Sequence, residues 1–305
     1  MGYIKVSEAA QRWGISSRRV RLLCAQNRID GVIRKGKLYM IPENTPRPID
    51  GRTVKGIKLP SELSALLLKI DALKAELDGK RPLTAGESQR FREQFMIDFT
   101  YNSNAIEGNT LTLKETAMVL EGMTIDKKPL KDHLEAVGHK DAFLYVEDIA
   151  KDTKINTTVI KNIHSLVLMD RPEDKGVFRK IPVMIMGAYK QPLQPYMIEP
   201  KLEQLLWEND ARKKTMHTIE RIARFHLEFE GIHPFIDGNG RCGRLILNLD
   251  LIQNGYPAIN VKFTDRHRYY NAFDEFYRNN DAKPMTKLVG EYVTERLEQY
   301  LEALK

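Results

Sequence analysis

The sequence predicts an all-α domain with a helical-bundle core and one β-hairpin, preceded by a small basic module. Three observations support this. Apolar residues recur at helical spacing from Pro60 onward, and convincing strand-like alternation occurs only in residues 179–195. Residues 1–59 contain 13 lysines and arginines against 4 acidic residues, whereas the remainder contains 35 and 37. This charge asymmetry favours two modules with different partners.

The length and composition are typical of a globular protein. A chain of 305 residues suits one large or two modest domains, and a hydrophobic content of 42% is ordinary for a globular protein. No stretch reaches the length of uncharged apolar sequence that a membrane helix needs, and the start lacks the pattern of a signal peptide. Cys24 and Cys242 are far apart and are expected to be free thiols in a reducing compartment. We therefore expect a cytoplasmic protein that does not act at a membrane.

The basic module predicts two short helices followed by a hairpin. Ser7 is a suitable cap for the first helix, Gly14 ends it, and Ser16 is a suitable cap for the second. Residues 31–42 then form two short apolar runs around a basic turn, which is typical of a β-hairpin. A stretch with two prolines and a glycine but no apolar period follows, and it indicates a linker.

Residues 3–42 resemble the small winged helix-turn-helix of the excisionase and MerR-like type. We place this domain at residues 1–45 and the linker at residues 46–59. The resemblance implies DNA binding by the second helix and by the hairpin as a wing. The implied DNA-binding residues are Arg18, Arg19, Arg21, Lys35 and Lys37. The alternative is a basic module that serves protein contacts or solubility.

Three amphipathic helices mark the second domain, residues 60–305. Their apolar positions recur over residues 63–77, 219–229 and 289–301. The predicted hairpin pairs residues 179–186 with residues 191–195 across a Gly-Ala turn. If its edge is free, it can bind an extended segment of another protein by strand addition. The alternative is a hairpin that only packs on the core.

Residues 233–244, His-Pro-Phe-Ile-Asp-Gly-Asn-Gly-Arg-Cys-Gly-Arg, concentrate groups that suit chemistry better than a core. Gly238 and Gly240 allow main-chain N–H groups to turn toward one point. Arg241 and Arg244 are three residues apart and share one face of a helix that starts here. A glycine-rich loop that opens into a helix N-terminus predicts an anion site. Two known loops do not fit, because a P-loop requires Lys where Arg stands and a calcium loop does not tolerate Arg241 at its fifth position.

These twelve residues resemble the signature of the Fic family, His-x-Phe-x-Asp/Glu-Gly-Asn-Gly-Arg-x-x-Arg, with every fixed position filled. The resemblance covers about residues 85–300 and implies a helical fold in which a hairpin flap lies beside the active site. It also implies a nucleotidyltransferase that performs AMPylation, the transfer of AMP from ATP to a Ser, Thr or Tyr hydroxyl of a protein. Such an enzyme is a protein adenylyltransferase.

The resemblance assigns roles residue by residue. His233 is the implied catalytic base, and Asp237 the implied ligand of Mg²⁺. Arg241 is expected at the β-phosphate and Arg244 at the γ-phosphate of ATP. The remaining implied phosphate or nucleotide contacts are Gly238, Asn239, Gly240, Tyr269 and Tyr270. The other histidines near these motifs, His164, His217 and His226, are assigned structural roles.

An upstream segment, Ser103-Asn-Ala-Ile-Glu-Gly108, resembles the family's inhibitory motif, Ser/Thr-x-x-x-Glu-Gly/Asn. The implied inhibitory residues are Ser103, Glu107 and Gly108. A glutamate that reaches Arg244 neutralises the group needed by the γ-phosphate and so produces autoinhibition. The alternative is a solvated glutamate at a helix terminus.

Together these features predict a self-inhibited adenylyltransferase of bacterial origin, fused to a DNA-binding module. Its target is another protein or the chain itself, and a homodimer stays open. One alternative is a Fic enzyme that removes AMP, with Glu107 orienting a water molecule. The other is a nucleotide-sensing transcriptional regulator in which catalysis is incidental.

Overall fold

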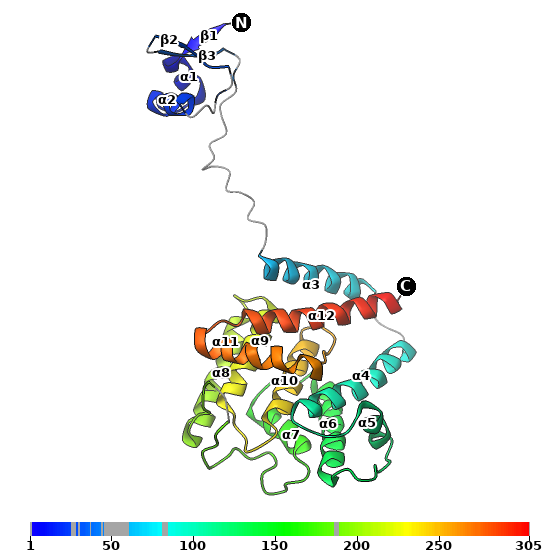
Figure 1. Ribbon diagram of the computed structural model, residues 1–305. Helices are drawn as coiled ribbons and strands as arrows, with labels where there is room; N and C mark the ends of the chain where they lie inside the picture. Colours follow the sequence, from blue (N-terminus) through cyan, green and yellow to red (C-terminus); the bar gives the residue numbers. More distant parts are fainter. Residues whose placement is uncertain are drawn as a thin grey trace. The chain divides into compact units, whose positions relative to one another are not determined.

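The computed structural model describes residues 2–25, 29, 31–36, 38–43, 45, 61–80, 85–185 and 189–304. The chain divides into two compact units, residues 1–59 and residues 60–305 (Figure 1). Each unit is considered by itself. The side chain of Arg19, and Lys37 and the predicted linker at 46–59, lie outside the described residues.

The first unit contains two helices and a three-stranded antiparallel sheet of order β1-β3-β2. Its elements are β1 (Tyr3–Lys5), α1 (Val6–Trp13), α2 (Ser17–Ala25), β2 (Ile33–Lys35) and β3 (Leu38–Pro42). Both predicted helices and the predicted hairpin are present, and Gly14 ends α1 at φ 63°. The expectation that Ser7 caps α1 is wrong, because the cap is Lys5, two residues earlier, and the Glu8 carboxylate accepts from the Lys5 N–H at 3.1 Å.

The second unit is a helical bundle. Its first half contains α3 (Glu62–Gly79), α4 (Ala85–Ile106), α5 (Leu113–Leu120), α6 (Leu130–Ile149) and α7 (Thr157–Val167). Its second half contains α8 (Ile198–Arg212), α9 (Thr218–Ile232), α10 (Asn239–Gln253), α11 (Arg266–Asn279) and α12 (Lys283–Ala303). Short 3-10 turns at Pro195–Met197 and Phe263–Asp265 precede α8 and α11. The three amphipathic helices predicted from the sequence correspond to α3, α9 and α12.

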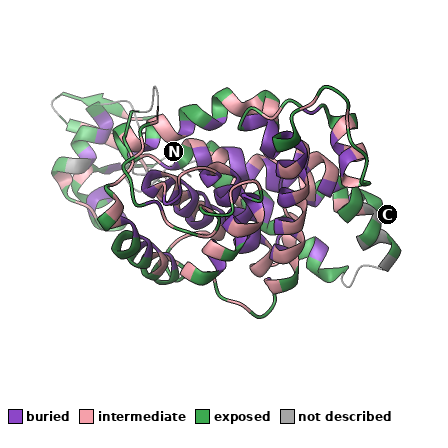
Figure 2. Ribbon diagram, turned by 90° about the horizontal axis from the view of Figure 1, so that it is seen from below, coloured by how far each residue is buried: buried purple, intermediate pink, exposed green. Residues whose placement is uncertain are grey.

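Helix α10 lies at the centre of the bundle and is buried along most of its length. It packs against α6, α7 and α9, while α3 lies along α12 at one side (Figure 1). Figure 2 shows buried residues concentrated in the interior helices and exposed residues on the outer faces. Gly255, at φ 77°, follows the end of α10. A helix so enclosed holds its first turn, and the loop before it, in a fixed position.

The predicted β-hairpin is wrong in its secondary structure. Within the described part of residues 179–195 there is no strand, and residues 186–188 lie outside it. The Gln191 side chain instead spans the two segments, accepting from Ile185 N at 3.1 Å and donating to Ile185 O at 3.2 Å. Pro182 and Pro192 lack the N–H that a ladder needs, which explains why the apolar alternation does not produce paired strands. We call residues 180–194 the flap segment.

Two further expectations can be compared with the fold. Cys24 and Cys242 are both buried free thiols, as the sequence predicts. No helix in the described ranges is long and apolar enough to cross a bilayer.

Candidate active site

The signature residues form the connection between α9 and α10. His233 ends α9 in the left-handed conformation at φ 52°, and Gly238, at φ 75°, precedes the first turn of α10. Asn239 closes the loop between them, because its side chain accepts from Phe235 N and donates to Phe235 O, both at 2.9 Å. Asn239 therefore shapes the loop, and its expected phosphate contact stays a prediction.

His164 supports this loop from α7. Gly176 N donates to His164 Nδ1 at 2.8 Å, so the neutral ring carries its proton on Nε2 and donates it to Asp237 O at 3.0 Å. The ring stacks on Phe235 with centroids 3.6 Å apart. Burial lowers the pKa of His164 to about 4, which keeps it neutral. The structural role expected for His164 agrees with these contacts.

His233 lies on the wall of the pocket that the loop borders. Burial lowers the pKa of its imidazole to about 4, and the nearby Arg179 guanidinium acts in the same direction. Arg179 Nε donates to His233 O at 2.8 Å and so fixes the main chain of the histidine. His233 is therefore neutral near pH 7 and able to accept a proton.

Arg244 is bound by the end of α4. Its Nε donates to Ser103 Oγ at 2.9 Å, and its Nη2 donates to Ser103 O at 2.8 Å and to Glu107 Oε1 at 2.7 Å. The guanidinium is 2% exposed, so the Glu107 carboxylate neutralises a buried charge. Burial by itself lowers the pKa of Arg244, but Glu107 and Tyr269 more than offset this effect, so the pKa lies above its usual value. The predicted motif thus lies against the predicted arginine.

Gly240 makes room for the Glu107 carboxylate. A Cβ at this position would lie 2.2 Å from Glu107 Oε1 and 3.1 Å from Arg244 Nη1. The carboxylate consequently sits directly on the first turn of α10, where main-chain N–H groups point outward. Glu107 occupies the place that an anion would take.

The pocket has a volume of about 430 Å³. Its polar lining includes Glu107, Glu230, His233 and Arg244, and its aromatic lining consists of Tyr269, Tyr270, Phe273 and Tyr277. Tyr269 is buried and its hydroxyl lies 2.6 Å from His226 Nε2, while the Tyr270 hydroxyl donates to Ile106 O at 3.3 Å. The arrangement suits a ligand with an anionic end and a flat ring.

Glu230, also on the wall of this pocket, was not expected from the sequence. Its Oε1 is buried and has no hydrogen-bond partner among the described residues. Burial, reinforced by the negative charge of Glu107, raises the pKa of Glu230 to about 8, although Arg244 opposes the shift. The carboxyl is therefore neutral near pH 7 and does not compete with Glu107 for Arg244.

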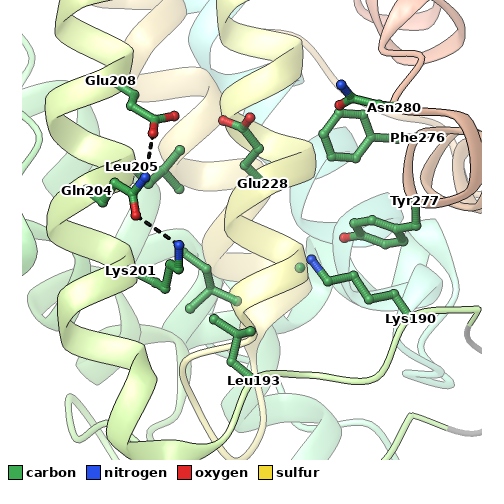
Figure 3. A pocket seen from close by; sticks show the side chains of 12 residues that line it. Lys190, Leu193, Lys201, Gln204, Leu205, Glu208, Glu228, Phe276, Tyr277 and Asn280 are labelled. Atoms are coloured by element: carbon green, nitrogen blue, oxygen red, sulfur yellow. Dashed lines mark hydrogen bonds between the residues drawn. The ribbon is translucent and has the colours of Figure 1, made fainter.

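A second pocket, of about 450 Å³, is lined by residues of α8, α9 and α11 (Figure 3). Lys190, Gly231 and Tyr277 line both pockets. Polar side chains of α8 bind one another along its wall, with Lys201 Nζ donating to Gln204 Oε1 at 2.9 Å and Gln204 Nε2 donating to Glu208 Oε1 at 2.7 Å. No signature residue lines this pocket, so the first one is the candidate active site.

Asp237 carries the carboxylate expected to hold Mg²⁺, and its side chain is 32% exposed. Its Oδ1 accepts from Gly238 N at 2.6 Å, and its Oδ2 lies 3.5 Å from Arg171 Nη2 and 4.0 Å from Lys131 Nζ. Burial raises the pKa of Asp237, but Arg241, the Gly238 N–H and the two surface cations together lower it below its usual value. Magnesium commonly takes one or two protein carboxylates and completes its shell with water and phosphate, so one ionised, half-exposed carboxylate fits it.

Arg241 does not line the pocket. Its guanidinium is 1% exposed and lies between two carboxylates, 3.0 Å from Glu135 Oε1 and 3.4 Å from Asp237 Oδ1. The predicted contact of Arg241 with the β-phosphate remains a prediction. Glu135 comes from α6, and no local spacing links it to the signature.

In the first unit, three of the five candidate DNA-binding side chains are described. Arg18, Arg21 and Lys35 are exposed on α2 and β2. Their exposure agrees with a role in binding a partner but does not identify it.

The chain is similar in sequence to known Fic proteins. The model of the Fic/DOC family matches residues 154–251. Protein adenylyltransferase Fic of Nematostella vectensis is 30% identical over 266 residues, which cover 84% of this chain and 62% of that protein. Protein adenylyltransferase fic-1 of Caenorhabditis briggsae is 32% identical over 219 residues, or 70% of this chain and 43% of the relative. The chain thus aligns with only about half of each curated relative.

Solved structures share the fold. A Fic domain-containing signaling protein from Bacteroides thetaiotaomicron matches with a TM-score of 0.71 at 26% identity, over 77% of this chain and 96% of that one. Fic-1 from C. elegans matches with a TM-score of 0.68 at 28% identity, over 79% of this chain and 72% of that one. The chain therefore carries a Fic domain on the helical fold of these proteins.

Proposed function

We propose that this chain is a self-inhibited protein adenylyltransferase that moves AMP from ATP to a hydroxyl of a protein. The observation that carries the proposal is the shared pocket of His233, a neutral base, and Arg244, a phosphate-binding group that Glu107 blocks. The relatives named protein adenylyltransferases support the same activity.

In the proposed reaction, His233 takes the proton of the acceptor hydroxyl. Its Nδ1 is buried, so Nε2 is the nitrogen available at the pocket wall. The hydroxyl oxygen bonds to the α-phosphorus, the bond from this phosphorus to the oxygen bridging to the β-phosphate breaks, and pyrophosphate leaves. Because the protein forms no covalent bond in this step, its contribution is positioning, proton transfer and charge stabilisation.

The rest of the site would hold ATP. The main-chain N–H of Gly240, in the first turn of α10, and the guanidinium of Arg244 suit the phosphates, whereas the Gly238 N–H donates to Asp237 Oδ1. Mg²⁺ held by Asp237 would neutralise charge on phosphate oxygens. Tyr269 and Tyr270 line the same pocket, and their rings are proposed contacts of the adenine.

Glu107 explains the proposed inhibition. While its carboxylate binds Arg244, that arginine is neutralised, and an incoming phosphate meets a negative charge where it needs a positive one. Removal of the carboxylate frees the arginine without moving His233. We infer that the γ-phosphate of ATP and Glu107 compete for Arg244.

The flap segment is proposed as the surface that receives the protein target. Ile181 is 59% exposed and Met184 is 75% exposed, and Arg179 ties the base of the segment to the main chain of His233. An exposed apolar segment beside His233 suits the binding of a protein that must present a hydroxyl to this histidine. Because Pro182 cannot donate, strand addition would use the remaining main-chain groups.

The test incubates wild type, Glu107→Gly and Glu107→Gly/His233→Ala with Mg²⁺ and α-labelled ATP, followed by intact mass. We expect AMP on the Glu107→Gly protein, on itself or on an added acceptor protein, and none on the double variant. If the Glu107→Gly protein binds ATP but transfers nothing to either, the transferase proposal fails. If wild type instead strips AMP from a modified acceptor and the Glu107→Gly protein does not, the enzyme is a de-AMPylase that uses Glu107.

A second proposed activity is DNA binding by the first unit. The exposed Arg18, Arg21 and Lys35 favour it. Retardation of labelled random duplexes, measured from low to high salt, tests this. Loss of binding in an Arg18→Ala/Arg21→Ala variant is expected. Equal weak binding by both proteins would instead indicate a module for protein contacts, and binding that shifts with ATP would favour the nucleotide-sensing regulator.

A further inference from the structure

We propose that Glu135 is a positioning residue of the active site, which acts through Arg241 to keep Asp237 available for the cation that accompanies ATP. The inference rests on the proposed function, because it concerns the binding of metal-bound nucleotide. Glu135 lies on α6, outside both the signature and the inhibitory motif.

The first step concerns the buried charge of Arg241. Its side chain is 1% exposed, and the Glu135 carboxylate beside it is 7% exposed. A guanidinium removed from water to this degree needs a counter-charge, and Glu135 is the nearer of its two carboxylates, at 3.0 Å against 3.4 Å for Asp237. Glu135 is therefore the main counter-charge of Arg241.

The second step concerns Asp237. If Glu135 were neutral, Asp237 would be the one remaining carboxylate beside Arg241, and the two would pair more tightly. A carboxylate paired with a fixed guanidinium is a poor cation ligand, because the positive charge repels the metal. The other cations near Asp237, Lys131 and Arg171, are 48% and 38% exposed, and such surface pairs separate at little cost. Arg241 is enclosed and cannot move away.

The third step concerns what holds Glu135. Asn109 Nδ2 donates to Glu135 Oε2 at 2.9 Å, and Asn104 Nδ2 donates to Glu135 O at 3.4 Å. Asn109 follows Glu107 by two residues, so one short segment at the end of α4 both blocks Arg244 and orients Glu135. Substitutions of Glu107 and Asn109 should therefore have opposite effects. Loss of the Glu107 carboxylate should raise AMP transfer, whereas loss of the Asn109 amide should weaken metal-dependent nucleotide binding.

The test measures ATP affinity by calorimetry, with Mg²⁺ and again with a chelator, in the full chain. The reference is Glu107→Gly/His233→Ala, which has no inhibitory carboxylate and no turnover. In this background Glu135→Gln is expected to weaken ATP binding about tenfold with Mg²⁺ and to leave the metal-free affinity unchanged, and Asn109→Ala should follow it in part. The matched control is Glu147→Gln, which removes another α6 carboxylate, one bound to Arg92, and should change neither value.

A fourth variant shows whether Glu135 acts through Arg241 and guards against a folding defect. Glu135→Gln/Arg241→Gln has no unpaired buried charge, so it should melt near the reference temperature. Loss of the expected β-phosphate contact lowers its ATP affinity with and without Mg²⁺ alike, but the ratio of the two affinities should return to the reference value. The inference is overturned if Glu135→Gln weakens ATP equally with and without Mg²⁺, or if this ratio is no higher in the fourth variant than in the single substitution. If the reference protein itself does not bind ATP, the proposed function fails, and this inference fails with it.

Discussion

At the scale of single residues, the chemistry depends on protonation states that burial imposes. His233 and His164 are both held neutral by burial, the first at the pocket wall and the second beneath the loop. Glu230 is neutral for the same reason, whereas Asp237 is ionised because cations surround it. Each state can be checked separately because each predicts a different response to pH.

The pH dependence of AMP transfer tests His233. Its lowered pKa, about 4, means that the imidazole stays neutral well below pH 6.5 and loses its capacity to accept a proton only in stronger acid. With saturating Mg²⁺ and ATP, the rate of the Glu107→Gly protein should be level from pH 8 to pH 6 and fall below about pH 5. A midpoint near 6.5 would show that His233 is not shielded in this way.

The stability of the protein against pH tests Glu230. The pKa of Glu230 is about 8 in the folded protein and 4.5 in the unfolded chain, so unfolding releases a proton at pH values between these two. The carboxyl therefore favours the fold most below pH 4.5, and this contribution is lost as pH rises through 8. The melting temperature of Glu230→Gln relative to wild type should accordingly rise between pH 5 and pH 9. A constant difference would mean that Glu230 is solvated.

Substitution of Ser103 tests how much its hydrogen bond with Arg244 adds to the inhibition by Glu107. Ser103→Ala removes the partner of Arg244 Nε but leaves Glu107 in place, so transfer should rise less than in Glu107→Gly. A hydrogen bond to a charged group contributes about 1.5–3 kcal/mol, which sets a ceiling of roughly a hundredfold on the gain. Ser165→Ala, which removes a hydroxyl bound to Asn162 O, is the control. Equal activation by Ser103→Ala and Glu107→Gly would contradict this ranking.

At the scale of elements, the flap segment depends on one side chain rather than on a strand ladder. Arg179 is 5% exposed and donates to main-chain carbonyls of His233, Ile181 and Leu193. Its planar guanidinium reaches three acceptors at once, which a lysine ammonium on a flexible stem does not reproduce. The segment and the catalytic base are therefore fixed to the same group.

Substitution of Arg179 should consequently affect both the fold and the reaction. In the Glu107→Gly background, Arg179→Lys is expected to lower the melting temperature and to reduce AMP transfer about tenfold or more, because three carbonyls lose a partner and the flap segment is released. Thermal melting and rates against acceptor concentration measure the two effects. Arg92→Lys, which alters an exposed ion pair with Glu147 outside the flap segment, should leave both nearly unchanged. Full transfer by Arg179→Lys would show that the flap segment needs no anchor.

The elements also show how far the sequence predicts this site. Helical spacing predicts α3, α9 and α12, and the Fic resemblance correctly implies that Glu107 faces Arg244. The predicted hairpin does not form paired strands, because its prolines lack the N–H that strand pairing requires. Alternation of apolar residues predicts which way side chains point, but it does not show whether the main chain can donate hydrogen bonds. Glu135 and Glu230 could not be predicted, because their partners are distant in the chain or their pKa depends on burial that only packing determines.

At the scale of the whole molecule, the two units divide the charge and, we propose, the activities. Removal of residues 1–59 should leave the melting transition of the helical unit and the effect of Glu107→Gly unchanged, because each unit has its own hydrophobic core. It should abolish salt-sensitive binding to duplex DNA. A truncated protein that no longer responds to the loss of Glu107 would show that the basic unit takes part in inhibition.

The central claim is that Glu107 inhibits by its charge on Arg244. The most direct measurement is the initial rate of AMP transfer by wild type and Glu107→Gln, at ATP concentrations from limiting to saturating. The amide keeps the size of the side chain and removes the ion pair. We expect Glu107→Gln to transfer AMP at least tenfold faster than wild type, and this gain should disappear when His233→Ala is added. Equal rates for wild type and Glu107→Gln, in a protein that binds ATP, would contradict the central claim.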